Sequence, residues 1–224
     1  MTEMFRQSLK AAKRIAPMAT ERTFPLIALS RLRMEIDGEG VTTLVAGSCC
    51  PLACKWCINA SALKKEPENV STQELFERVK CDDLYFQASG GGLTFGGGES
   101  LLYTDFISEF RTLIGCRWHL YAETSLAVAE ENIRLAAEVI DGFIVDIKDM
   151  NPEIYRAYTG GKVEEMEKNL RLLLSLAGPE RVLVRVPLIP QYNTESDCEK
   201  SVQKLKEMGV MRFDRFTYRI KNDT

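Results

Sequence analysis

The sequence lacks any long apolar run, although 45% of its 224 residues are hydrophobic. No stretch approaches the roughly 20 apolar residues with which a helix crosses a bilayer, and nothing resembles a secretory signal. We therefore expect a cytoplasmic protein without a membrane span. In that compartment, the seven cysteines are expected to be reduced thiols rather than a disulfide framework.

An excess of positive charge is also missing. The chain has 29 Lys and Arg against 32 Asp and Glu, which gives a formal net charge of -3. Proteins that bind DNA usually present a broad basic surface that neutralises phosphates, so this balance argues against a DNA partner. Low-complexity segments and internal linkers are absent as well, and the length suits one domain with one core.

What the sequence does contain is a regular alternation of strand-like and helix-like segments from about residue 41 onward. Strands are predicted at Val41–Ser48, Leu93–Gly96 with a lead-in from Leu84, Trp118–Ala122, Gly142–Lys148, Val182–Ile189 and Arg212–Tyr218. Helices are predicted at Thr72–Lys80, preceded by a capping box that starts at Ser71, and at Leu101–Ile114, Val128–Ile140, Val163–Leu176 and Glu195–Met208. Strands joined by helices imply a parallel α/β sheet, either doubly wound or curled toward a barrel. Residues 1–33 precede this pattern and are expected to form a helix packed outside it.

Three thiols stand close together in the loop after the first predicted strand, in Cys50-Pro-Leu-Ala-Cys54-Lys-Trp-Cys57. A short loop of this kind can wrap a metal centre. Four thiolates saturate the common type of iron–sulfur cluster, so three thiolates leave one iron open to a further ligand. An open iron can chelate the amino and carboxylate groups of methionine, and an electron passed through the cluster can break an adjacent sulfonium bond.

Zinc and ordinary buried thiols are the alternatives. A closed zinc site takes four ligands, commonly from paired Cys or Cys/His sets, whereas the single histidine, His119, lies about sixty residues away. Cys49 is adjacent to the three thiols, but a ligand set that begins there has an unusual spacing, so we treat Cys49 as a spare. The remaining cysteines are single and scattered, which is typical of small buried residues: Cys81, Cys116 and Cys198.

A second signal is Thr94-Phe-Gly-Gly-Gly98-Glu99-Ser100, where glycines follow a predicted strand and precede a carboxylate. The segment lacks a nucleotide fingerprint, and its open backbone with Glu99 suits a ligand that carries an ammonium group. A plain glycine turn, with Glu99 as a first-turn helix charge, is the alternative. Polar residues also lie at the ends of the later strands: Glu123, Thr124, Asp146, Lys148 and Arg185. Because the carboxyl ends of parallel strands meet at one face, we expect all of these in one site.

With these residues in view, the chain resembles the pyruvate formate-lyase activating enzymes and related glycyl-radical-enzyme activases of the radical S-adenosylmethionine superfamily. The resemblance covers about residues 36–218. Four segments carry it: Ile36–Gly40, the Cys50 to Cys57 loop, Ala88–Thr94 running into Gly97-Gly98-Glu99, and Val145–Met150. It implies a partial (β/α)6 TIM-like barrel of parallel strands over residues 36–224, with residues 1–35 as an N-terminal helical extension.

The resemblance also implies roles for single residues. Cys50, Cys54 and Cys57 correspond to the ligands of a [4Fe–4S] cluster, and Trp56 stands where an aromatic borders the adenine of S-adenosylmethionine. The other implied cofactor contacts are Gly97, Gly98 and Glu99 for the amino group, Glu123 for the ribose and Lys148 for the carboxylate. Glu123, Thr124 and Asp146 resemble a monovalent cation site. Asp37 and Arg185 resemble the catalytic groups that receive a glycine loop of a partner.

The implied reaction cleaves S-adenosylmethionine to methionine and a 5'-deoxyadenosyl radical, which takes a hydrogen from a backbone glycine of a large partner enzyme. Glycine suits this role because it lacks a side chain and lets the backbone approach closely. The implied electron donor is flavodoxin or ferredoxin. One departure concerns partner recognition: Thr42 follows Val41 where the family usually has an arginine. Two alternatives stay open, a radical enzyme of similar scaffold that acts on a small molecule, peptide or RNA, and a non-catalytic iron–sulfur protein.

Overall fold

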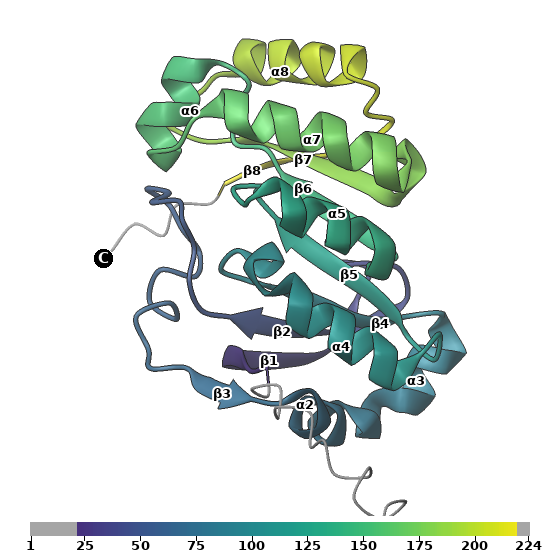
Figure 1. Cartoon of the computed structure of the whole chain (residues 1–224). Coiled ribbons are helices and arrows are strands. Elements are labelled where there is room, and N and C mark those ends of the chain that lie inside the picture. The colour runs from purple at the N-terminus through teal and green to yellow at the C-terminus, as the bar shows by residue number, and fades with distance from the viewer. Residues whose placement is uncertain (1–21, 219–224) are drawn as a thin grey trace, which may run out of the picture.

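The computed structural model describes residues 22–218, which form one eight-stranded sheet with helices packed against it (Figure 1). Six strands run parallel to one another: β2 (Val41–Gly47), β4 (Gly92–Gly97), β5 (His119–Thr124), β6 (Gly142–Asp146), β7 (Val182–Leu188) and β8 (Arg212–Thr217). The strand order is β3-β1-β2-β4-β5-β6-β7-β8. The predicted parallel α/β sheet of six strands is therefore confirmed.

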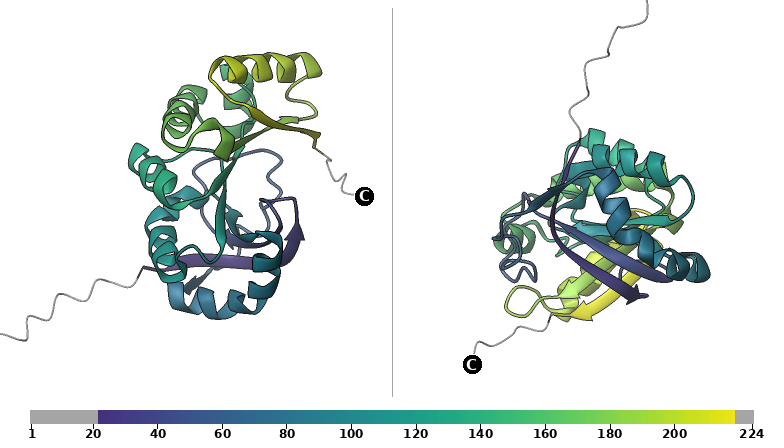
Figure 2. Two further views of the ribbon diagram at one scale, coloured as in Figure 1. Left: turned by 90° about the vertical axis from the view of Figure 1, so that its right-hand side faces the viewer. Right: turned by 90° about the horizontal axis from the view of Figure 1, so that it is seen from below.

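The helices lie on one side of the sheet, as Figure 1 and the left view of Figure 2 show. They are α2 (Thr72–Val79), α3 (Asp83–Ser89), α4 (Thr104–Ile114), α5 (Glu130–Val139), α6 (Pro152–Thr159), α7 (Val163–Ala177) and α8 (Glu195–Glu207). The capping box predicted before α2 is present, because the Ser71 and Glu74 side chains each accept a bond from the other's backbone N–H. None of the helices among residues 22–218 has the length and apolar character needed to cross a membrane.

Alternation along the strands separates an apolar outer face from a polar inner face. Phe95, Ala122 and Phe143 are register partners on three neighbouring strands, and all belong to the buried core beneath the helices. On the opposite, inner face, Asp146, Arg185 and Asp214 are register partners across β6, β7 and β8. The hydrophobic core therefore lies between the sheet and the helices, and polar side chains occupy the inner face.

The two ends of the sheet are brought toward each other by the turn between β1 (Phe24–Met34) and β2. Glu39 in this turn pairs with Arg212 of β8 at 3.6 Å. Arg185 of β7 donates to the carbonyl of Ile36 in the same turn at 2.6 Å. The sheet thus curls into a partial barrel whose two ends are joined by side-chain contacts rather than by a strand ladder.

One prediction about the first part of the chain is wrong. Residues 24–33, expected to be helical, belong to strand β1, which pairs antiparallel with β2 and with the short β3 (Glu68–Val70). The reason is the alternate burial of Phe24 and Leu26 against the sheet, a strand period within a segment whose basic residues suggested an exposed helix. Residues 1–21 of the expected helical extension lie outside the described residues. The domain boundary at residue 36 stays a prediction.

The expected strand lead-in from Leu84 is also wrong, because these residues form α3, which ends at Gly90 in the left-handed conformation (φ 69°). Leu84 is 75% exposed on this helix. Its apolar side chain was interpreted as part of a buried strand, although it faces solvent. Helix α6 was not predicted. It begins at Asn151, whose side chain accepts from the backbone N–H of Glu153, and has Pro152 at its first position.

Candidate functional site

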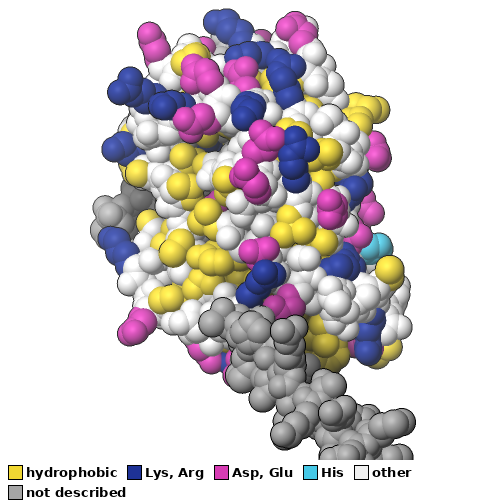
Figure 3. Space-filling model, in the orientation of Figure 1, with side chains coloured by type: hydrophobic (Ala, Val, Ile, Leu, Met, Phe, Trp, Pro, Cys, Tyr) yellow, Lys and Arg dark blue, Asp and Glu magenta, His cyan; other side chains and the backbone are white. Residues whose placement is uncertain are grey.

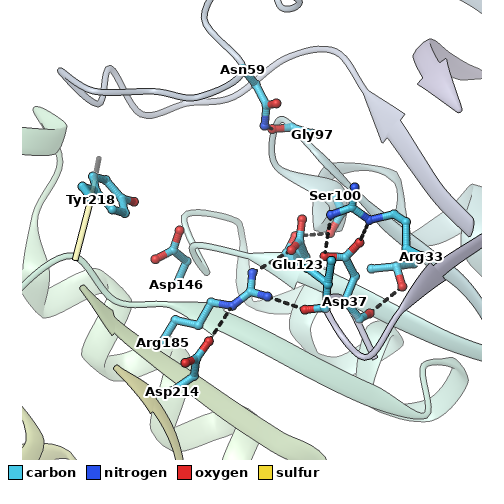
Figure 4. Close-up of polar contacts among 12 residues, drawn as sticks. Arg33, Asp37, Asn59, Gly97, Ser100, Glu123, Asp146, Arg185, Asp214 and Tyr218 are labelled. Carbon is cyan, nitrogen blue, oxygen red and sulfur yellow. Dashed lines mark hydrogen bonds and ion pairs between the residues drawn. The ribbon is translucent and has the colours of Figure 1, made fainter. Parts of the chain in front are cut away.

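Arg185 lies at the centre of a polar cluster on the inner face (Figure 4). Its guanidinium donates to Glu123 Oε1 at 2.7 Å and to the Ile36 carbonyl at 2.6 Å, and Asp214 Oδ2 lies 3.4 Å from Nε. Only 16% of the Arg185 side chain is exposed, so these acceptors are what makes its burial tolerable. Burial and the nearby Asp37 carboxylate raise the pKa of Glu123, and Arg185 opposes that rise. The structure thus joins the predicted ribose residue and a predicted partner-binding residue in one ion pair.

Asp37, the other predicted partner-binding residue, is 1% exposed. Its carboxylate is paired with Arg33, whose Nη2 lies 3.1 Å from Oδ1 and whose Nε donates to Oδ2. Its backbone carbonyl accepts from Thr94 Oγ1 at 2.6 Å. Asp37 and Arg185 are brought to the same wall of the barrel, and Arg33 is a member of this group that the sequence did not reveal.

Lys148 lies further along the inner face, beyond the end of β6. Its ammonium donates to Asp146 and, at 2.7 Å, to the hydroxyl of Tyr218. Burial works against the charged lysine, but the interactions with Asp146 and Tyr218 together outweigh it, so the pKa of Lys148 is raised and the group stays cationic. Asp146 Oδ1 is buried and has no hydrogen-bond partner among residues 22–218. A buried carboxylate oxygen without a partner is costly, so this oxygen marks a place where a cation or a donor would be stabilised.

The glycine segment at the end of β4 touches the cysteine loop through its backbone. The Glu99 N–H donates to the Cys49 carbonyl at 2.8 Å, and the Asn59 side chain donates to the Gly97 carbonyl at 2.7 Å. A Cβ atom on Gly98 would stand 2.0 Å from the Cys49 carbonyl oxygen, so the two segments approach each other as closely as glycine alone permits.

The Glu99 carboxylate is 1% exposed and already well supplied with donors. Thr124 Oγ1 donates to it at 2.6 Å, and Ser125 donates through its N–H at 2.8 Å and its hydroxyl at 2.6 Å. It also accepts from Leu101 N at 3.2 Å, at the start of the 3-10 turn η2 (Ser100–Tyr103). The Glu99 carboxylate therefore links the end of β4 to the end of β5. The hydroxyl proton of Thr124 is already engaged in the hydrogen bond to Glu99. The predicted ligand roles of Glu99 and Thr124 stay predictions.

The cysteine loop is fixed by backbone bonds to the end of α6. Ala53 N donates to the Thr159 carbonyl at 2.8 Å, and Lys55 N donates to the Tyr158 carbonyl at 3.1 Å. These bonds bring the loop over the inner face, beside Lys148. The loop is therefore held from two sides, by α6 and by the glycine segment.

Cys50, Cys54 and Cys57 are half-buried free thiols. Burial raises the pKa of Cys54 to about 11, with Lys148 acting against it and the other two thiols adding to it. Burial is also the main cause of the raised pKa of Cys50, to which Glu99 and Cys57 contribute. The three thiols therefore lie close enough to one another to interact electrostatically.

Cys49 faces another direction. Its Sγ lies 3.6 Å from Ser48 Oγ, and a hydrogen bond from Tyr103 lowers the pKa of its thiol. This placement supports Cys50 over Cys49 as a member of the three-thiol set. Trp56, beside Cys57, is 38% exposed and so presents a ring surface to solvent near the loop.

Residues 22–218 contain no preformed site for a single metal ion. Within residues 22–218, no three His, Cys, Asp or Glu side chains are arranged to hold one ion, so the zinc alternative has no preformed tetrahedral site. A four-iron cube holds its thiolates farther apart than one ion does, and the donor set of three thiols fits it. Of the other cysteines, Cys198 is buried as expected, but Cys81 and Cys116 are exposed, because each lies in a turn beyond the end of a helix.

The fold and the three-thiol loop define a partial-barrel enzyme with an iron–sulfur site at the carboxyl ends of its strands. The chain belongs to the radical SAM superfamily, whose model matches residues 44–205. Its membership and its partial-barrel fold are thereby confirmed, and the [4Fe–4S] cluster and S-adenosylmethionine are cofactors general to this family. Radical SAM membership makes the chain an enzyme.

Curated relatives of the chain are activating enzymes. The (2S)-3-sulfopropanediol sulfolyase activating enzyme of Bilophila wadsworthia is 26% identical over 81% of this chain and 81% of its own length. The (2S)-3-sulfopropanediol dehydratase activating enzyme of Klebsiella oxytoca is 34% identical over 61% of this chain, and the pyruvate formate-lyase 2-activating enzyme of Escherichia coli is 27% identical over 70%. The chain spans 43% and 64% of the lengths of these last two relatives.

Solved structures agree on the fold. Streptococcus suis SuiB bound to its precursor peptide SuiA superposes with a TM-score of 0.62 at 12% identity, over 79% of this chain and 38% of that one. The structure of anSMEcpe with bound AdoMet superposes with a TM-score of 0.59 at 20% identity, over 80% of this chain and 52% of that one.

Proposed function

We propose that the chain is a glycyl-radical-enzyme activating enzyme, which removes one hydrogen atom from a backbone glycine of a large partner protein. The observation that carries this proposal is the shared inner face. The three-thiol loop, Lys148, Asp37 and Arg185 all border this face, which supports a cofactor site beside a site for a polar backbone segment. The activating enzymes among its relatives support the same activity.

In this proposal, Cys50, Cys54 and Cys57 hold the cluster, and the backbone of Gly97 and Gly98 with Lys148 holds the methionine end of S-adenosylmethionine. Trp56 lies along the adenine and Glu123 takes the ribose. The cluster and S-adenosylmethionine, when bound and given one electron by flavodoxin or ferredoxin, would supply the radical that takes the hydrogen atom. The products are methionine, 5'-deoxyadenosine and a glycyl radical on the partner, so one electron and one hydrogen atom are accounted for.

Asp37 and Arg185 orient the partner's backbone in this proposal. A glycine segment offers N–H donors and carbonyl acceptors, which match a carboxylate and a guanidinium. The inner wall also excludes water from the reacting carbon, since both groups are largely buried.

The monovalent cation site is part of the same proposal. It consists of Asp146, Thr124 and Glu123, and it is supported by the unpartnered Asp146 oxygen. Oxygen ligands of this kind suit hard cations. A cation there would neutralise part of the negative charge that Glu123 and Asp146 bring to the inner face.

Lys148→Ala is expected to raise the Kd for S-adenosylmethionine roughly 10- to 100-fold, since a hydrogen bond to a charged group is worth about 1.5–3 kcal/mol. The lysine is 8% exposed and already held by Asp146 and Tyr218, so little freedom is lost when it binds a carboxylate. Equilibrium binding to reconstituted protein measures the change. Lys162→Ala is the matched control, because Lys162 is exposed on the surface beside Glu165. A Lys148→Ala protein with wild-type affinity means that the lysine does not contact the cofactor.

The proposed function is tested by anaerobic reconstitution and incubation with S-adenosylmethionine, a one-electron reductant and a candidate glycyl-radical enzyme. We expect a stable glycyl radical signal in the partner by electron paramagnetic resonance, together with 5'-deoxyadenosine and methionine. Cofactor cleavage without a glycyl radical in any cognate partner would instead favour a small molecule, peptide or RNA substrate. Binding of S-adenosylmethionine without any cleavage would favour a non-catalytic protein.

A further inference from the structure

Arg33 reaches the inner face because β1 contains a bulge. Ser30 pairs with Leu44 and Arg33 pairs with Thr42, so the two residues between them on β1 are opposed by one residue of β2. Leu32, within the bulge, has a left-handed backbone (φ 55°). One extra residue reverses the alternation that follows, which places Arg33 on the same side as Ser30, and Arg33 Nη1 indeed lies 3.4 Å from Ser30 Oγ.

Arg31, two residues earlier, points to the opposite side of β1. It pairs with Asp82, whose side chain is fully buried near the helices and also accepts from Thr43 Oγ1 at 2.9 Å. The bulge therefore separates two arginines that each pair with a buried aspartate. The Arg31 side chain lies on the outer face of the sheet and the Arg33 side chain lies on the inner face.

Three side chains hold the Ile36–Asp37 part of the turn, and only one of them contacts the carboxylate. Thr94 holds the carbonyl of Asp37 at 2.6 Å, and Arg185 holds the carbonyl of Ile36 at 2.6 Å. Arg33 is the cation in contact with the Asp37 carboxylate. Without Arg33, a carboxylate that is 1% exposed would lie uncompensated beside Glu123, and it would have to take up a proton or move.

Thr42 lies directly across the ladder from Arg33 and is 0% exposed. Its Oγ1 is buried and has no hydrogen-bond partner among the residues that the structure describes. Side chains that face each other across two antiparallel strands share one location, so residue 42 borders the space that the Arg33 guanidinium fills. An arginine of the neighbouring strand therefore occupies the space beside residue 42.

We propose that Arg33 is a positioning residue: from the bulge in β1 it holds the buried Asp37 carboxylate in the orientation that, with Arg185, receives the backbone of the radical-accepting segment. This inference rests on the proposed function and extends it to a residue that contacts neither cofactor nor partner. Arg33 acts through Asp37, so its loss changes hydrogen abstraction from the partner while cluster and cofactor binding stay in place.

The test compares the full-length reconstituted holoenzymes of wild type, R33A, R31A, D37N and the R33A/D37N double variant, with the partner that the wild type activates. For R33A we expect the glycyl radical formed per 5'-deoxyadenosine to fall at least about tenfold, since displacement of a positioning group by about 1 Å costs up to 100-fold. R31A also loses an ion pair to a buried aspartate, so it is the matched control for stability, and its ratio is expected to stay within about twofold of wild type. In the D37N background, R33A is expected to add no further loss, because its partner is already gone.

A relocation variant sharpens the result. R33A/T42R returns a guanidinium to the same space from β2, and it is expected to recover the ratio to within about threefold of wild type. Thermal unfolding is recorded for every variant, so a fold defect is recognised directly. The inference is overturned if R33A matches wild type, or if R31A lowers the ratio as much as R33A at an equal loss of melting temperature, or if R33A lowers the ratio equally in the D37N background. A wild type that activates no partner overturns the proposed function itself, which separates the two failures.

Discussion

Cys54→Ala protein, reconstituted anaerobically, is expected to retain no open-iron cluster and to release no 5'-deoxyadenosine. The half-buried Cys54 thiol lies within electrostatic reach of Cys50, Cys57 and Lys148. Cys49 cannot replace it, since its thiol is turned toward Ser48 and Tyr103. Loss of an outer-shell partner of a metal ligand already costs about 10- to 100-fold, so loss of the ligand itself is expected to cost more than about 100-fold in cofactor cleavage.

Iron and sulfide content, the absorption of the cluster and the yield of 5'-deoxyadenosine measure this change. Cys116→Ala is the matched control, because Cys116 is an exposed thiol outside the site. Cys49→Ala tests the ligand register and is expected to keep the cluster. A Cys54→Ala protein that binds four irons and cleaves S-adenosylmethionine, or a wild type that binds zinc in place of iron, contradicts the assignment of the three thiols.

The parallel strands were predictable because their sequences are mostly apolar. In Val182–Leu188 only Arg185 is polar, and the observed bounds lie within one residue of the prediction. β1 was not predictable in the same way. Its inward and outward residues exchange sides at the bulge, so no single period runs through Arg31 and Arg33. The helix α3 was mistaken for a strand because Leu84 and Tyr85 are apolar yet exposed.

The site was predictable where neighbours in the sequence are neighbours in space. The spacing of Cys50, Cys54 and Cys57 within one loop is of this kind, as is the pairing of Asp146 with Lys148. The bond between Arg185 and Glu123 joins residues that are 62 positions apart, and only the strand register determines it. Tyr218 lies at the end of the last predicted strand. Asp146 was chosen as a site residue because it lies at the end of a predicted strand, so the same criterion could have identified Tyr218.

Figure 3 shows basic and acidic side chains interspersed over the face that carries the helices. A separate grouping of charge lies on the inner face, where Asp37, Glu123, Asp146 and Asp214 are matched by Arg33, Lys148 and Arg185. Composition alone could not reveal this grouping, because a near-neutral total hides a dense local network. The charges that matter for the proposed chemistry are therefore those that the barrel encloses.

Gly98→Ala is expected to remove cluster and cofactor cleavage together, although it changes neither a ligand nor a charge. The new Cβ would lie 2.0 Å from the Cys49 carbonyl oxygen, 2.8 Å from its carbon and 3.1 Å from the Ser48 carbonyl oxygen. All three atoms belong to the backbone, so relief requires movement of the junction between β2 and the cysteine loop. That movement breaks the bond from Glu99 N to Cys49 O, and a displacement of about 1 Å at a reacting site costs up to 100-fold in rate.

Gly90→Ala is the matched control, from the same glycine-rich region. Gly90 has a left-handed backbone (φ 69°), and no atom lies within 4 Å of the position that a Cβ would take, so alanine there costs about 1–2 kcal/mol of backbone strain without a clash. We expect Gly90→Ala to melt at a lower temperature and to keep its iron and its 5'-deoxyadenosine yield, whereas Gly98→Ala loses both. If Gly98→Ala keeps a full cluster and cleaves S-adenosylmethionine at the wild-type rate, close contact between the glycine segment and Cys49 is not what places the three thiols.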